Sequence, residues 1–166
     1  MSVTINLKYL LLIIAGLFLW LTGIFLIPVL ASAGPAWVRQ LANWGYFFYH
    51  PVCHQIADRS FAINGFPMAV CIRCLAVYMA GFFLCLGVLR TRRISPLSLP
   101  VYLLLLFPAI SDFIMEKIMP YQGLPWLRFV TGFFMGVALF HLILLSVGTP
   151  ASHTKNLYRT NSFSTQ

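Results

Sequence analysis

Residues 9–30 read YLLLIIAGLFLWLTGIFLIPVL, a run that contains no charged side chain. A helix needs about 20 mostly apolar residues to cross the hydrocarbon core of a bilayer, and this run is long enough. In lipid, every backbone polar group must be hydrogen-bonded within the protein, and a helix satisfies this requirement by itself. The sequence therefore predicts a membrane-spanning helix over residues 9–30.

The composition of the whole chain also indicates a membrane protein. The chain has 166 residues, of which 60% are hydrophobic and 8% are charged, whereas soluble domains are about 45–50% apolar and about 25% charged. The net charge of +8 comes from basic residues spread over loops and tails. This distribution indicates topology signals and attraction to anionic lipid, and no nucleic-acid recognition motif accompanies it. We therefore expect the lipid bilayer as a partner, and no nucleic acid.

Three more apolar runs are long enough to span the membrane. They cover about residues 67–89, 97–118 and 129–147. Pro100 and Pro108 lie inside the third predicted helix and are expected to bend it, because proline removes a backbone hydrogen bond. We therefore predict an all-α fold, a four-helix transmembrane bundle that forms a single domain over residues 1–147.

The distribution of Lys and Arg predicts the orientation, because cytoplasmic loops carry an excess of these residues. Arg90, Arg92 and Arg93 crowd the short link between the second and third predicted spans. We therefore place both termini in the cytoplasm and the loop of residues 31–66 outside, in the inner membrane of a bacterial cell. The Ser-, Thr- and Asn-rich residues 148–166 are predicted to form a disordered polar tail.

The first apolar run has a second interpretation. Lys8, the run itself and then Ala31-Ser32-Ala33 also resemble a signal peptide with a small-residue cleavage site. The apolar core of a signal peptide is usually about 7–15 residues long, and this run is longer, which favours a retained span. Under both interpretations, the residues that follow start outside.

The first loop is predicted to contain a helix of its own. Pro35 can open a helix at its first position. Four apolar residues then fall on one face by helical spacing: Trp37, Leu41, Trp44 and Phe48. This pattern predicts an amphipathic helix that lies in the membrane interface. The alternative is a lid that packs on the bundle, and both hold residues 50–61 close to the membrane surface.

Residues 53–74 hold three of the four cysteines of the chain. Cys71 and Cys74 are three residues apart and share a helix face, while Cys53 and His54 come from the loop. A set of three cysteines and one histidine is typical of zinc and suits other thiolate-binding metals. Adjacent residues such as Cys53 and His54 seldom converge on one ion, and His50 is a substitute for His54.

The same cysteines support two further interpretations. An outward face allows disulfides and thiol–disulfide chemistry, in outline similar to the quinone-linked membrane disulfide oxidases, which also have four helices and an outer C-x-x-C. Those enzymes use two cysteine pairs, whereas this chain has only three outer cysteines. The fourth, Cys85, lies roughly 16 Å deeper than Cys74 at helical rise and is expected in the core. The thiols can also simply pack, or staple the loop to the second span in a structural or assembly subunit. The sequence leaves open whether the protein is an enzyme.

Charged residues from several regions are predicted to meet in the same outer layer. Asp112 and Glu116 are one turn apart in the third span. The nearby cations are Arg59, Arg73 and Arg128. Charges at membrane depth are expensive and usually pair with one another inside the bundle. We therefore expect the two acids to pair with these arginines, and we take all five residues as candidates for holding a cofactor.

Two features of the fourth predicted span concern packing. Gly132 and Gly136 form a G-x-x-x-G motif, which allows close helix contact within the chain, with a second copy or with a membrane partner. His141 stands alone deep in this span. We predict that it is a hydrogen-bonded core residue and not a ligand.

Several motifs of the chain resemble a family of small bacterial integral membrane proteins known only as a domain of unknown function. They are C-H-Q and D-R-S-F in the loop, C-I-R-C-L-A-V-Y at the second span and R-F-V-T-G at the start of the fourth. The resemblance includes Asp112 and covers roughly residues 45–147, although the family usually has Gly where this chain has Ala76. It implies a multi-span bacterial membrane protein with a Cys/His/Arg centre, and it supplies no reaction, substrate or cofactor.

Overall fold

The computed structural model describes residues 2–118 and 124–150 of the chain. Its five α-helices are α1 (Leu7–Ser32), α2 (Ala36–Tyr49), α3 (Ile72–Thr91), α4 (Leu99–Ile118) and α5 (Pro125–Val147). The minor elements are a short 3-10 helix (Ala57–Arg59) and the strands β1 (Val3–Thr4), β2 (Ala62–Ile63), β3 (Phe66–Pro67), β4 (Arg93–Ile94) and β5 (Thr149–Pro150). Helices α1, α3, α4 and α5 are long and apolar enough to cross a membrane. The predicted all-α transmembrane bundle is therefore confirmed.

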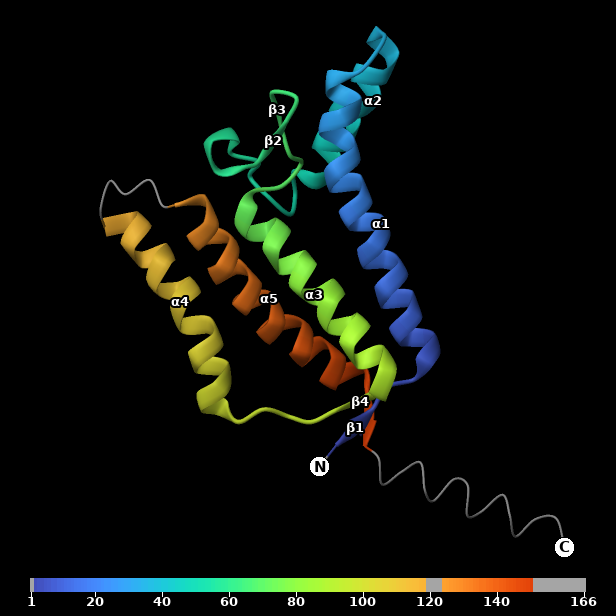
Figure 1. Cartoon of the computed structure of the whole chain (residues 1–166), viewed down its shortest axis with the longest axis vertical. Coiled ribbons are helices and arrows are strands. Elements are labelled where there is room, and N and C mark those ends of the chain that lie inside the picture. Colours follow the sequence, from blue (N-terminus) through green and yellow to red (C-terminus); the bar gives the residue numbers. More distant parts are fainter. Residues whose placement is uncertain (1, 119–123, 151–166) are drawn as a thin grey trace, which may run out of the picture.

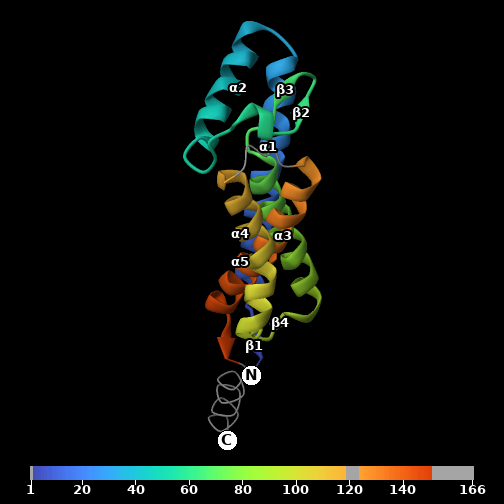
Figure 2. The same ribbon diagram turned by 90° about the vertical axis from the view of Figure 1, so that its left-hand side faces the viewer.

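The long helices lie side by side in the order α1, α3, α5 and α4 (Figures 1 and 2). The closest pair is α3 and α5, because two glycines of α5 face α3. A Cβ on Gly132 would lie 2.5 Å from the backbone oxygen of Arg73, and one on Gly136 would lie 2.6 Å from that of Val77. The G-x-x-x-G motif therefore serves a contact within the chain, and these glycines are not available to the second copy or membrane partner that the sequence also allowed.

Helix α3 begins later than the sequence predicts. Phe66 and Pro67 belong to strand β3, which pairs antiparallel with β2. Asn64 and Gly65 connect the two strands with positive φ angles of 52° and 84°, as a tight hairpin turn requires. Met68 to Val70 then lead through a bend at Ala69 and Val70 to Cys71, the N-cap of α3.

The prolines of α4 have different effects from those expected. Pro100 is the second residue of the helix, where its missing N–H breaks no helical hydrogen bond. Pro108 does lie inside the helix. Only Pro108 is therefore in a position to bend α4.

The predicted loop helix is α2, and it turns back along the end of α1 (Figure 2). A Cβ on Gly45 would lie 2.7 Å from the Ile27 side chain, and the hydroxyl of Tyr49 donates to the carbonyl oxygen of Trp20 at 2.8 Å. The other face of α2 exposes large apolar residues: Trp37, Leu41, Trp44, Phe47 and Phe48. Helix α2 therefore combines a contact with the bundle and an apolar face that suits the membrane interface.

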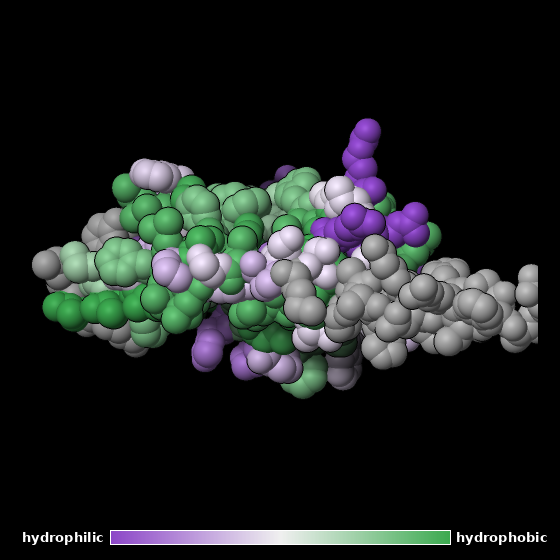
Figure 3. Space-filling model, turned by 90° about the horizontal axis from the view of Figure 1, so that it is seen from below, coloured by the Kyte–Doolittle hydropathy of each residue, from purple (hydrophilic) through white to green (hydrophobic). Residues whose placement is uncertain are grey.

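A three-stranded sheet of order β4-β1-β5 ties together one end of the bundle, which we call the terminal end (Figure 1). Val3 pairs with both Ile94 and Pro150. Figure 3 looks at this end and shows hydrophilic residues grouped on a largely hydrophobic surface. Two residues of the predicted tail, Thr149 and Pro150, are thus in a strand, and residues 151–166 lie outside the described residues. Residues 33–71 lie at the opposite end, which we call the loop end.

Candidate functional site

Three cysteine sulfurs meet at the loop end of the bundle. Cys53 follows α2, Cys71 is the N-cap of α3 and Cys74 lies in the first turn of α3. Their Sγ atoms all lie within 4.8 Å of one another, and those of Cys71 and Cys74 are 3.4 Å apart. The backbone N–H of Cys71 donates to Sγ of Cys53 at 3.1 Å. These three residues form the three-cysteine cluster.

Gln55 holds the loop in the position that brings Cys53 to the other two cysteines. Its side-chain amide donates to the carbonyl oxygens of Tyr46 at 2.7 Å and Ala69 at 2.9 Å, so it joins the end of α2 to the segment before α3. Its φ angle is +50°, which is uncommon for a residue other than glycine. This role was not predicted from the sequence, where the only signal for it is the position of Gln55 within the C-H-Q motif.

The two histidines proposed as ligands are not part of the cluster. Cys53 is buried, whereas His54 and His50 are both exposed. Among the residues that the structure describes, the group that can hold one ion consists of the three cysteines alone. Cys85 is buried in a separate core with Leu10 and Leu144, in agreement with its expected place in the core.

The five predicted charged residues form a network beside the cluster. Arg73 pairs with Asp112 and lies 3.6 Å from Glu116. Glu116 also accepts from Arg128 at 3.3 Å and pairs with Arg59. The side chains of Asp112, Glu116 and Arg128 are 5%, 9% and 8% exposed, whereas that of Arg59 is 44% exposed, so the network is buried on the side of the bundle and open to solvent at Arg59. The expected pairing of acids with arginines is therefore present.

The three thiols share one cavity of about 190 Å³ with four of the five charged residues, all but Asp112. It is lined by Val52, Cys53, His54, Gln55, Ile56, Arg59, Cys71, Arg73, Cys74, Glu116 and Arg128. Three arginines against two carboxylates leave the charged network with one excess positive charge. This excess favours a negative charge on the neighbouring sulfurs.

Hydrogen bonds within the cluster act in the same direction on Cys53. Side-chain hydrogen bonding with Cys71, and then with Cys74, lowers the pKa of the Cys53 thiol. Burial of the thiol opposes this effect, and backbone N–H groups of Cys71 and Gln55 add to it. Because the thiolate is the form that binds metals and acts as a nucleophile, Cys53 is the sulfur prepared for either role.

Two other features of the bundle have no such chemistry. His141 is buried and its Nδ1 lies 2.7 Å from the hydroxyl of Tyr102, which confirms that it is a hydrogen-bonded core residue.

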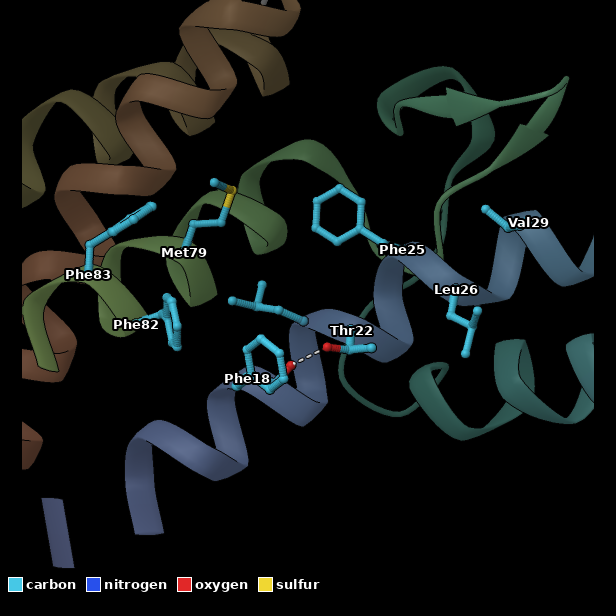
Figure 4. Close-up of a pocket in the computed structure, with 9 residues that line it drawn as sticks. Phe18, Thr22, Phe25, Leu26, Val29, Met79, Phe82 and Phe83 are labelled. Atoms are coloured by element: carbon cyan, nitrogen blue, oxygen red, sulfur yellow. Dashed lines mark hydrogen bonds between the residues drawn. The ribbon is translucent and has the colours of Figure 1, made fainter. Parts of the chain in front are cut away.

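A larger cavity of about 520 Å³ lies between α1 and α3, and Figure 4 shows the apolar side chains of both helices around it. Its one polar side chain, Thr22, donates back to the carbonyl oxygen of Phe18 at 2.8 Å.

The part of the chain that matches a known family includes the three cysteines and the five charged residues. Residues 53–142 match the family model described as "Predicted membrane protein (DUF2085)". An uncharacterized protein of Methanocaldococcus jannaschii, MJ1492, is 30% identical over 143 residues, which cover 82% of this chain and 91% of the relative. No solved structure matches the chain. The relative is archaeal, so the similarity is not confined to the bacterial proteins that the sequence motifs resemble. The chain belongs to the DUF2085 family of predicted membrane proteins.

Proposed function

We propose that the three-cysteine cluster binds one divalent, thiolate-preferring metal ion, with zinc as the best fit. The observation that carries this proposal is the convergence of three sulfurs within 4.8 Å. Zinc binds thiolate at about 2.3 Å in tetrahedral geometry, so sulfurs on one zinc lie roughly 3.8 Å apart. The 3.4 Å between the sulfurs of Cys71 and Cys74 is close to that value.

The charges around the cluster support the same ion. Three thiolates and one divalent cation together carry one negative charge. The adjacent network of Arg59, Arg73, Arg128, Asp112 and Glu116 carries one positive charge, as its ion pairs show. A loaded centre would therefore be neutral as a whole, which removes the cost of an uncompensated buried charge.

The fourth coordination position belongs to the proposal as well. Zinc sites with three protein ligands keep a position for water or substrate, whereas structural sites close it with a fourth residue. His54 lines the cavity of the cluster although its side chain is exposed. We assign the fourth position to His54 or to a water in this cavity, and a His54→Ala variant that keeps its metal would select the water.

We also propose an orientation for the site. The exposed Arg90, Arg92 and Arg93 lie at the terminal end of the bundle, and an excess of arginine is typical of the cytoplasmic side. The three-cysteine cluster at the loop end would then face the outside of the inner membrane.

The decisive experiment is metal analysis of the protein purified without added chelator. We expect about one zinc per chain by inductively coupled plasma mass spectrometry, and its loss when Cys53, Cys71 or Cys74 is replaced by serine. A Cys85→Ser variant is the matched control, since this cysteine lies in a separate core, and it should keep the metal. The proposal is refuted if the unsubstituted protein contains no metal although it is folded and is obtained in the same yield as the serine variants.

A second candidate function is thiol–disulfide oxidoreduction, favoured by the 3.4 Å between the sulfurs of Cys71 and Cys74. Two thiols would lose two electrons and two protons to a quinone, and a disulfide and a quinol would form. Cys53 would then be the third, exchanging thiol. Protection of the cysteines that ends with reductant and not with chelator would select this candidate.

A further inference from the structure

The cavity of the three-cysteine cluster lies between the bundle and the loop. One of its walls consists of residues of α3, α4 and α5, and the other consists of loop residues, among them Ile56 and Arg59. Residues 56–60, which we call the cover segment, contain the 3-10 helix. They lie above the ends of α3 and α5 (Figure 1) and so close the cavity on the side of the loop.

The cover segment is weakly held. Residues 56–59 are all exposed, and the hydrogen bonds of its backbone and of the Ser60 hydroxyl stay within the segment. Of the hydrogen bonds and ion pairs between described residues, one ties it to the bundle, the pair of Arg59 with Glu116. Gln55, just before the segment, makes two hydrogen bonds to backbone oxygens elsewhere. Segments with few buried contacts open locally at a low free energy.

The two partners of this ion pair differ in how firmly they are placed. The side chain of Glu116 is 9% exposed and is also held by Arg73 of α3 and Arg128 of α5. That of Arg59 is 44% exposed and reaches the carboxylate from the loop. We propose that the Arg59–Glu116 ion pair is a latch that holds the cover segment closed, and that opening of this segment admits and releases the metal ion.

The loop end is the side from which a hydrated cation can reach the sulfurs. Helices α3 and α5 are in close contact beside the cluster, where a Cβ on Gly132 would lie 2.5 Å from the backbone oxygen of Arg73. The lipid around the spans excludes ions, because charge is costly at membrane depth. The inference rests on the proposed metal site for the identity of the ion, whereas opening of the segment is also measurable on the metal-free thiols.

Rates of zinc release from the full chain in detergent test the latch. A chromogenic chelator in excess removes the zinc, and its absorbance gives the rate. Arg59→Gln breaks the ion pair, and since a partly exposed pair contributes little to stability, we expect release to be about three- to fivefold faster. Arg59→Lys keeps a cation and should release zinc at nearly the rate of the unsubstituted protein. Arg39→Gln, which replaces an exposed arginine of α2, is the matched control and should change nothing.

Salt provides a test that needs no substitution. Raising the NaCl concentration from about 0.1 M to about 1 M shortens the Debye length from about 10 Å to about 3 Å, which weakens an ion pair with a solvent-exposed partner. Zinc release from the unsubstituted protein should become about threefold faster. Release from Arg59→Gln should hardly change, because this variant has no ion pair left to screen.

Alkylation of the metal-free thiols separates the latch from the metal site. In chelator-treated protein, a neutral maleimide should react with the three-cysteine cluster faster in Arg59→Gln than in the unsubstituted chain. Loss of a neighbouring positive charge would by itself disfavour the thiolates and slow the reaction, so a faster reaction reports access. If the purified protein contains no zinc and this difference is still found, the proposed metal site fails and the latch stands.

Two results would overturn the proposal. Equal alkylation rates of Arg59→Gln and the unsubstituted protein at low salt would show that the ion pair does not hold the segment closed. A rate difference that remains undiminished at about 1 M NaCl would assign the effect to altered packing of the loop, since ion pairs at the surface are screened under this condition.

Discussion

The sulfur of Cys53 accepts a hydrogen bond from the backbone N–H of Cys71 at 3.1 Å. This bond joins a loop residue to the start of a membrane-spanning helix 18 positions later in the chain. The N-terminus of a helix carries a partial positive charge, so the contact favours a thiolate at Cys53. The same contact places that thiolate beside the two sulfurs that α3 provides.

Metal removal should expose the cysteines to alkylation. In the folded, untreated protein we expect Cys53, Cys71 and Cys74 to resist a maleimide, because metal-bound thiolates are protected. Chelator alone should release them, and intact-protein mass spectrometry would count the added groups. Free reaction of all three before any treatment would leave packing as their role.

The ion pair of Asp112 should contribute to stability. Asp112→Asn leaves the largely buried Arg73 with one fewer acceptor, and loss of one partner from a buried pair costs about 3–5 kcal/mol. The exposed fraction of Arg73 is 20%, so we expect the lower end of this range as a decrease in the free energy of unfolding. Asp58→Asn, at an exposed position of the 3-10 helix, is the control and should have little effect.

Glycine packing between α3 and α5 should be sensitive to a single methyl group. Gly136→Ala would place a Cβ 2.6 Å from the backbone oxygen of Val77, and overpacking of this kind costs about 1–3 kcal/mol. Gly87→Ala meets nothing within 4 Å and should be tolerated. Thermal unfolding of the two variants in the same detergent measures the difference, and equal midpoints would contradict the close helix contact.

Gln55 should be required for the cluster although it is no ligand. Gln55→Ala removes both hydrogen bonds that hold the loop to α2 and to Ala69, each worth about 1 kcal/mol. We expect a lower metal affinity and faster alkylation of Cys53, with little change at Cys85. Metal titration with a chromogenic chelator measures the affinity, and an unchanged value would assign the loop position to other contacts.

The orientation can be tested with single introduced cysteines. Asn64→Cys, at the loop end, should react with an impermeant maleimide added to spheroplasts, and Ser95→Cys, at the terminal end, should react only after lysis. Both positions are exposed, and peptide mass spectrometry distinguishes them from the native cysteines. Labelling of Ser95→Cys from outside would reverse the proposed topology.

The membrane class, the all-α fold and the four spans could be predicted from sequence, because each depends on local composition. A run of about 20 apolar residues has to form a helix in lipid whatever surrounds it. The pairing of Asp112 and Glu116 with arginines was also predictable, since their positions along the spans put them at one depth and buried charges need partners.

The tertiary structure decided what local patterns left open. Cys53 and His54 are adjacent in sequence, so the sequence does not say which of them faces the bundle. The hydrogen bonds of Gln55 fix the path of the loop, and on this path the sulfur is buried and the imidazole is exposed. The G-x-x-x-G motif likewise suits an internal or an external contact, and the approach of α3 selects the internal one. Both outcomes rest on contacts between residues distant in sequence, whereas hydrophobic periodicity reports only on neighbours along the chain.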